Sequence, residues 1–147
     1  MDFRAIVKNG IEKTFHPNGN LATEVTYRND LPNGVTKHWH LNGRLAAEYP
    51  VKHGVVEGVA KCWNERGDLL GEYEIRDGCG VMKCWHPNGR LMGEITMRKG
   101  QNTGRLRALD EAGEVIGEEF YIENQKVSKK KYREACKTNP HLPAYDD

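Results

Sequence analysis

Glycine recurs at a fixed spacing along this 147-residue chain, and that spacing limits what the chain can fold into. The segments open at intervals of 24, 24, 22 and 24 residues, at Gly10, Gly34, Gly58, Gly80 and Gly104. A second glycine follows nine residues after each of these, at Gly19, Gly43, Gly67, Gly89 and Gly113. Such a period indicates one supersecondary unit per repeat, stacked on its neighbours.

Three further columns share the period. Counted from the opening glycine, the third position is basic, at Lys13, Lys37, Lys61, Lys83 and Arg107. The fifth position is large and apolar, at Phe15, Trp39, Trp63, Trp85 and Leu109, and the fourteenth is glutamate, at Glu24, Glu48, Glu72, Glu94 and Glu118. Runs of about six residues on either side of a glycine turn are the length of strands, so each repeat is predicted to be a β-hairpin.

The turn sequence His86-Pro87-Asn88-Gly89 favours a three-residue loop, a type I turn followed by a glycine with positive φ. A two-residue turn centred on Asn-Gly is the alternative. The three-residue loop places Trp85 opposite Leu91 and predicts Lys83 opposite Gly93. One face of the hairpin is then expected to carry Val81, Lys83, Trp85, Leu91, Gly93, Ile95 and Met97, and the other Cys84, His86, Met92 and Glu94.

Five hairpins in series, preceded by a strand at residues 3–7, predict a mainly β protein with a single-layer antiparallel meander. A helix is expected to cap it, with Ser128 as N-cap, Val127 and Tyr132 as a hydrophobic staple, and Asn139-Pro140 as its end. The predicted division is a repeat domain at residues 1–127 and a capping helix with an extended tail at residues 128–147.

The repeat resembles the MORN-variant repeat, and in particular the bacterial YwqK-like antitoxin family. The residues that carry the resemblance include Gly34, Lys37, Trp39, Asn42, Gly43, Leu45, Glu48 and Gly54, with equivalents from Gly10 to Asn124. The resemblance implies a stack of hairpins used as a binding scaffold. Its bacterial members are toxin neutralisers, and its eukaryotic relatives are linked to membranes, phosphoinositides and dimerisation.

The sequence offers little for catalysis or cofactors. The 22 basic and 21 acidic side chains leave no net field for binding nucleic acid. Only His38 and His40 are expected close enough to share a metal, and they lack a third ligand, so no metal, cofactor or catalytic site is predicted. The start lacks the pattern of a signal peptide, and the cysteine spacing fits no disulfide framework. We therefore expect a cytoplasmic protein whose free thiols include Cys79, in a loop, as the most accessible.

An aromatic strip with lysine borders is the predicted partner-binding surface, formed by Trp39, Trp63, Trp85, Tyr49, Tyr73, Lys37, Lys61 and Lys83. The competing interpretation is that the sheet curls and buries these rings among the hairpins. The leading hypothesis is a non-catalytic protein-binding module, most concretely an antitoxin or immunity protein that binds a cognate toxin. The alternatives are a membrane-associated or phosphoinositide-associated scaffold, and a self-associating scaffold such as a homodimer.

Overall fold

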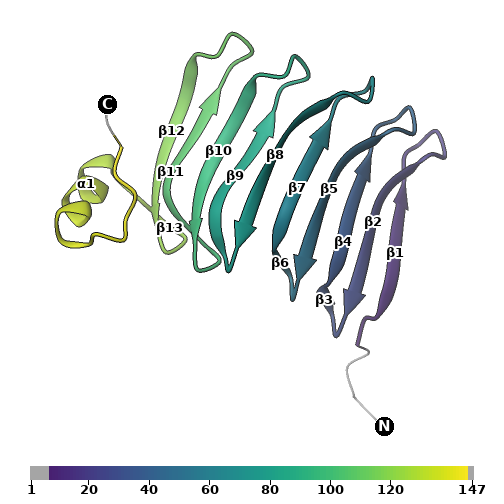
Figure 1. Cartoon of the computed structure of the whole chain (residues 1–147), viewed down its shortest axis with the longest axis horizontal. Helices are drawn as coiled ribbons and strands as arrows, with labels where there is room; N and C mark the ends of the chain where they lie inside the picture. Colours follow the sequence, from purple (N-terminus) through teal and green to yellow (C-terminus); the bar gives the residue numbers. More distant parts are fainter. Residues whose placement is uncertain (1–6, 146–147) are drawn as a thin grey trace. The chain divides into compact units, whose positions relative to one another are not determined.

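The computed structural model describes residues 7–145, in which thirteen strands precede one helix (Figure 1). The described chain forms two compact units, which meet between Leu69 and Leu70. The predicted mainly β meander of hairpins with a C-terminal helix is confirmed. Of the strand expected at residues 3–7, residues 3–6 lie outside the described chain, and Val7 is in no strand.

Unit 1 is an antiparallel meander of two complete hairpins and the first strand of a third. The strands pair in the order β1-β2-β4-β5-β7, and the two-residue strands β3 and β6 pair with β2 and β5. Their bounds are β1 Gly10–Phe15, β2 Leu21–Arg28, β3 Leu31–Pro32, β4 Gly34–Trp39, β5 Leu45–Lys52, β6 Val55–Val56 and β7 Gly58–Trp63.

Unit 2 continues the same pattern and ends in the cap. Its strands pair antiparallel in chain order from β8 to β13. Their bounds are β8 Leu69–Arg76, β9 Cys79–Trp85, β10 Leu91–Arg98, β11 Gln101–Leu109, β12 Val115–Ile122 and β13 Gln125–Val127, and helix α1 spans Lys129–Thr138.

The predicted turn is confirmed. In the fourth hairpin the N–H of His86 donates to the carbonyl of Arg90 at 2.8 Å, and the N–H of Gly89 donates to the carbonyl of His86 at 2.9 Å. Gly89 has φ of 89°, which a residue with a Cβ adopts only with strain. Trp85 pairs with Leu91, as the three-residue loop requires.

A second irregularity, which the sequence did not predict, follows the turns of the first, second, fourth and fifth hairpins. In β10 the register steps past Met92, so that Cys84 pairs with Gly93, Lys83 with Glu94 and Met82 with Ile95. The same step occurs in the first, second and fifth hairpins. The predicted opposition of Lys83 and Gly93 is therefore wrong, because the bulge turns every later residue of the second strand to the other face.

The side chains of one turn bond to the next turn along the chain. His16 Nε2 lies 2.8 Å from the carbonyl oxygen of Trp39, and His40 Nε2 lies 2.9 Å from that of Trp63. A carbonyl only accepts, so the Nε2 atoms of these histidines carry the proton. This turn ladder is completed by amide donors, since Asn18 donates to Leu41 O at 2.8 Å.

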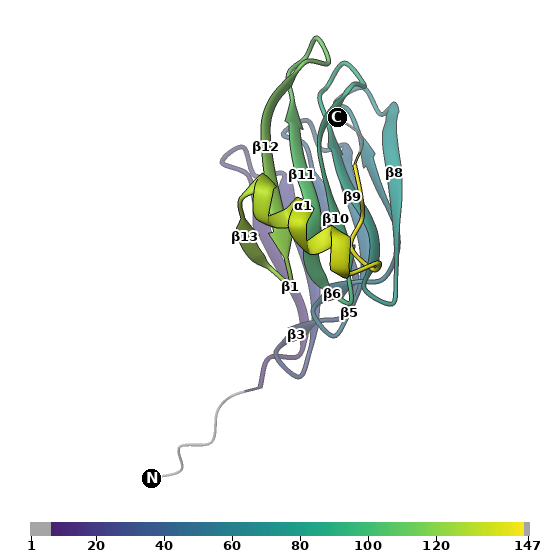
Figure 2. The ribbon, with the colours of Figure 1, turned by 90° about the vertical axis from the view of Figure 1, so that its left-hand side faces the viewer.

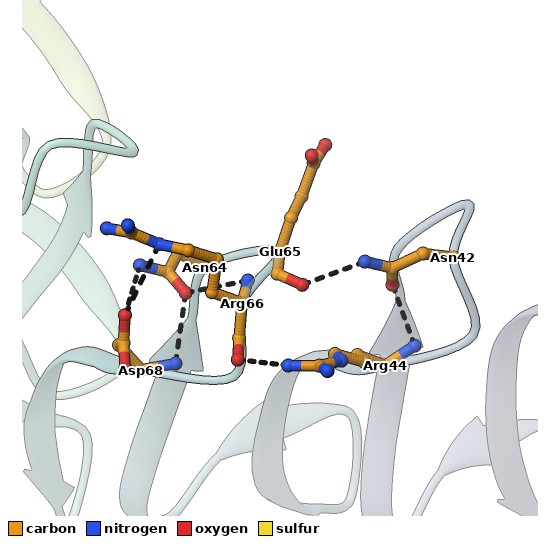
Figure 3. A network of polar contacts seen from close by, with 6 residues as sticks. All are labelled: Asn42, Arg44, Asn64, Glu65, Arg66 and Asp68. Atoms are coloured by element: carbon orange, nitrogen blue, oxygen red, sulfur yellow. Dashed lines mark hydrogen bonds and ion pairs between the residues drawn. The ribbon is translucent and has the colours of Figure 1, made fainter.

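Figure 3 shows the turn ladder between the second and third turns. Asn42 Nδ2 donates to Glu65 O at 2.8 Å, and the guanidinium of Arg44 donates to the carbonyl of Arg66. The third turn has different chemistry. Its Asn64 donates to Asp68 of the same turn at 3.2 Å, and unit 1 ends one residue later. In unit 2 the ladder resumes, with His86 Nε2 2.8 Å from Leu109 O.

The core of the cap lies between β12 and α1, and Figures 1 and 2 together show the helix at the end of the sheet, beyond its last strands. Phe120, Tyr132 and Leu142 are buried there, and the Ser128 hydroxyl caps the helix by accepting from Lys131 N at 3.1 Å. The segment after the helix packs on the sheet as well. Tyr145 Oη accepts from the N–H of Arg105 at 3.0 Å, and its ring lies under the Arg105 guanidinium. Residues 141–145 therefore belong to the cap.

Candidate functional site

The register gives the sheet of each unit two chemically different faces. On one face cationic and acidic side chains alternate from strand to strand, because each lysine or arginine of the third repeat position pairs with a glutamate. This charged row comprises Lys13, Glu24, Lys37, Glu48 and Lys61 in unit 1, and Lys83, Glu94, Arg107 and Glu118 in unit 2.

Cations of the charged row form ion pairs with the glutamates beside them. Arg107 Nη2 lies 3.0 Å from Glu94 Oε1, and Lys13 Nζ lies 4.0 Å from Glu24 Oε2. Glu118 is shared between Arg105 at 3.7 Å and Lys129 of the helix at 3.4 Å. Lys83 therefore pairs with Glu94 and not, as predicted, with Gly93. The lysine column is instead half of a charge ladder that links successive strands.

The opposite face of unit 2 is hollowed into an open apolar groove of about 540 Å³. Strands β8 to β11 form the groove. Its floor consists of residue pairs between neighbouring strands, and the register step at Met92 determines which residues pair. The lining residues of this face are Tyr73, Met82, Cys84, Met92, Gly93, Ile95, Leu106 and Ala108, and Lys83, Glu94 and Arg107, which the register assigns to the charged row, also border the groove. Most of this lining is hydrocarbon and sulfur, so the groove suits an apolar ligand group.

Small residues account for the hollow. Cys84 pairs with Gly93, Gly93 with Ala108, and Ala108 with Gly117, which makes a row of short side chains across four strands. Larger side chains stand beside the row, where Met82 pairs with Ile95 and Ile95 with Leu106. The difference in side-chain length produces the depression.

The thiol in the groove is chemically quiet. All four cysteines are free, and Cys84 is the exposed one, whereas Cys79 begins β9 and is half-buried. The prediction that Cys79 lies in a loop as the most accessible thiol is therefore wrong. Partial burial raises the pKa of Cys84 above its ordinary value, which disfavours the nucleophilic thiolate at neutral pH.

The eight predicted partner-binding residues do not form one strip. Tyr73 and Lys83 line the groove, whereas Trp85 is not among its lining residues and has its indole against Gly71. In unit 1, Tyr49 shares a face with His38, while Lys37 and Lys61 belong to the charged row on the other face. Trp39 and Trp63 are half-buried at strand ends, where their carbonyls accept from the turn ladder. The expected common face is wrong for the same reason as the register.

The histidines take part in polar contacts between protein groups. His38 Nε2 lies 2.9 Å from Tyr49 Oη and the two rings stack, while His40 belongs to the turn ladder. Within residues 7–145, no three side chains of His, Cys, Asp or Glu are grouped so as to hold a metal ion. The same part of the chain contains no helix long and apolar enough to cross a membrane.

Sequence reasoning missed the groove residues Met82, Cys84, Met92, Ile95 and Leu106 as a set. It named Tyr73 and Lys83, but it assigned Ile95 and Cys84 to opposite faces. The signal that could have found the set is the change of the second and fourth repeat positions to apolar residues from the third repeat onward, with the large side chains Met82 and Leu106 in the last two repeats.

Comparison with known proteins identifies the repeat. A family model described as MORN repeat variant matches residues 8–29 and residues 79–99. Each matched segment spans one of the hairpins that the period predicts, β1 with β2 and β9 with β10. These two segments are therefore similar to repeats of the MORN type, which suggest a binding or scaffold module. Neither the curated proteins nor the solved structures contain a significant match.

Proposed function

We propose that this MORN-repeat protein is a non-catalytic protein-binding module, and that the groove of unit 2 holds an apolar segment of its protein partner. The observation that supports the proposal is the groove itself, a depression of about 540 Å³ lined mainly by apolar side chains. Depressions of this kind are the usual place for anchoring side chains of a partner.

The chemistry of the groove supports a side-chain ligand rather than an added strand. Strands β9, β10 and β11 are paired on both sides, so their main-chain groups are already used. Recognition then depends on contact with Met82, Met92, Ile95 and Leu106. Methionine adapts its shape to a bound surface, as in grooves that receive the apolar face of an amphipathic helix.

The most concrete form of the proposal is an antitoxin or immunity protein that neutralises a cognate toxin by covering it. The resemblance of the repeats to the bacterial YwqK-like antitoxins supports this form. It requires no metal or cofactor and no nucleic acid, and it places the protein in the cytoplasm, where four free thiols persist. Recruitment to anionic lipid through the lysine column is less favoured, because those lysines pair with glutamates.

A growth-rescue experiment tests the proposal. The full chain is co-expressed with the product of an adjacent toxin-like gene, and rescue is compared between Met92→Lys and Ile116→Lys. These residues occupy the same repeat position, the bulge of the second strand, and both are exposed, but only Met92 lines the groove. We expect Met92→Lys to abolish rescue and to weaken binding by about tenfold or more, and Ile116→Lys to keep both.

The binding itself is measured by calorimetry with the two purified proteins. Equal rescue by the two variants would exclude the groove as the contact surface. Failure of the unsubstituted chain either to bind or to rescue would remove the antitoxin form of the proposal.

A further inference from the structure

The first strand of unit 1 has an outer edge that no described residue covers. Within residues 7–145, β1 pairs only with β2 along its length. All six residues of β1 are exposed, with Ile11 at 62% and Phe15 at 63%. A strand edge in this condition offers unpaired N–H and C=O groups to another extended segment.

The contacts between successive hairpins show which groups pair with such a strand edge. Where one hairpin meets the next in unit 1, a glutamate of the earlier hairpin lies opposite a lysine of the later one, as in the pairs Glu24 with Lys37 and Glu48 with Lys61. The turn of the earlier hairpin also donates to two carbonyls of the later one, those of Trp39 and Leu41 at the second turn. Unit 2 repeats both features, since Glu94 pairs with Arg107 and His86 donates to Leu109 O.

The edge of β1 carries the same groups as the first strand and turn of the second hairpin, namely a lysine and carbonyl acceptors. Lys13 pairs with Glu24 on one side, whereas Lys37 has a glutamate on both sides. The carbonyls of Phe15 and Pro17 occupy the positions of the Trp39 and Leu41 carbonyls, and no described side chain donates to them. A segment with an acidic residue and side-chain N–H donors is therefore complementary to this edge.

We propose that β1 receives an extended segment of a partner protein by antiparallel strand addition, with an acidic residue of that segment opposite Lys13. A side-chain N–H of the partner, from asparagine, arginine or histidine, reaches the carbonyl of Phe15. Main-chain hydrogen bonds supply the affinity, and the acidic residue fixes the register. This surface lies in unit 1 and is separate from the groove of unit 2.

A second copy of this chain is a poor occupant in a head-to-tail arrangement. The strand that would have to be offered, β12, already pairs with β13 and packs against α1. The fifth turn also lacks these side-chain donors, because Asp110, Ala112 and Glu114 occupy the positions at which the first, second and fourth turns have histidine, asparagine, and asparagine or arginine. The Asp110 carboxylate instead accepts from the N–H groups of Ala112 and Glu114 at 2.9 Å.

Two β1 edges are also a poor match for each other. Two identical sheets that join edge to edge with the same face on the same side are related by a two-fold axis perpendicular to the sheet. In such an antiparallel pair one residue must lie opposite its own copy. The two registers with the longest overlap of Gly10–Phe15 place either Glu12 against Glu12 or Lys13 against Lys13. Like charges directly opposite each other destabilise a strand pair.

The test uses the full chain and two synthetic peptides. The first peptide copies residues 16–28, which carry the turn donors and Glu24, and the second has lysine in place of Glu24. Binding is measured by calorimetry, and the bound region by hydrogen exchange. We expect the acidic peptide to slow exchange within residues 10–15 and to bind about fivefold more tightly than the lysine peptide.

Reversing the charge of Lys13 distinguishes binding at the β1 edge from non-specific electrostatic attraction between the peptide and the protein. Lys13→Glu is expected to reverse the preference between the peptides, whereas Lys137→Glu, the same change of charge on an exposed residue of α1, leaves it unaltered. Met92→Lys in the groove is also expected to leave the preference between the two peptides unaltered. The groove proposal and the β1-edge proposal can therefore fail independently of each other.

Three results would overturn the proposal. One is the absence of peptide binding, or equal binding of both peptides to the unsubstituted chain. Another is a dimer in sedimentation whose exchange protection maps to residues 10–15, which would assign the edge to a second copy. The third is protection of residues 10–15 in the free monomer, which would assign it to another segment of the same chain.

Discussion

Gly71 lies under the indole of Trp85, and this contact allows a quantitative test of packing in unit 2. A Cβ atom at Gly71 would lie 2.3 Å from Cζ2 and 2.4 Å from Cε2 of Trp85. Carbon atoms in contact normally lie about 3.5–4.0 Å apart, so the ring would have to move by about an ångström or more. We expect Gly71→Ala to lower the free energy of unfolding by about 1–3 kcal/mol, the usual cost of overpacking.

Gly117 provides the matched control, because it occupies the same repeat position in the last hairpin. A Cβ atom there would meet only the Cβ of Ala108, at an ordinary 3.7 Å. Without a clash, alanine in a strand restricts the unfolded chain more than glycine does. Gly117→Ala is therefore expected to raise the free energy of unfolding by about 0.5–1 kcal/mol. The two substitutions should differ in sign.

The assay is urea unfolding of the full chain, followed by tryptophan fluorescence and by circular dichroism. Trp85→Leu supplies a second arm, because a smaller side chain removes the clash. In that background Gly71→Ala should no longer be destabilising, and the coupling between the two sites should be about 1 kcal/mol or more. If Gly71→Ala and Gly117→Ala changed the stability alike, the inferred contact between Gly71 and the indole would be refuted.

Three further predictions concern single contacts. His86→Ala removes the bond to Leu109 O and should lower the free energy of unfolding by about 0.5–1.5 kcal/mol, while the exposed His141→Ala, measured in the same urea titration, should change it little. Tyr145→Phe takes the acceptor from the Arg105 N–H, so native-state hydrogen exchange of that amide should become faster if the tail packs as described. Burial raises the pKa of Cys84, so its alkylation by iodoacetamide, followed by mass spectrometry, should reach half its maximal rate at a pH above about 8.5, and a midpoint below that value would contradict the packing around the thiol.

Local chemistry was predictable from the sequence wherever a residue type has a single conformational use. The turn at His86-Pro87-Asn88-Gly89 follows from proline and glycine alone, and the helix start at Ser128 follows from the capping rule. Both features depend on residues within a few positions of each other. The period of the hairpins needed only the recurrence of such local signals.

The faces of the sheet were not predictable in the same way. No single residue type marks the bulge in the sequence. The bulged residue is Met92 in the fourth hairpin, and its equivalents in other hairpins are Ala22, Ala46 and Ile116. One added residue exchanges the two faces for the rest of the strand. The groove, the charged row and the separation of Tyr49 from Lys37 all depend on that step.

The packing of the tail was also beyond local reasoning. The residues after the helix were expected to form an extended tail. Leu142 is nevertheless buried with Phe120 and Tyr132, which are 22 and 10 residues away in sequence. Contacts between such distant positions are decided by the tertiary surface that is available to them.

The columns that recur in every repeat and the columns that vary have different roles. The recurring lysine and glutamate columns form the charged row, and the turn ladder joins successive hairpins, so recurrence here marks the forces that hold the sheet together. The variable columns lie on the opposite face. The second repeat position reads Glu12, Thr36, Ala60, Met82 and Leu106, and the fourth reads Thr14, His38, Cys62, Cys84 and Ala108. Both columns change from polar to apolar at the third repeat, and the groove lies over the last two repeats, where the second position is also large. Partner specificity in such a repeat protein is therefore expected in the columns that do not repeat.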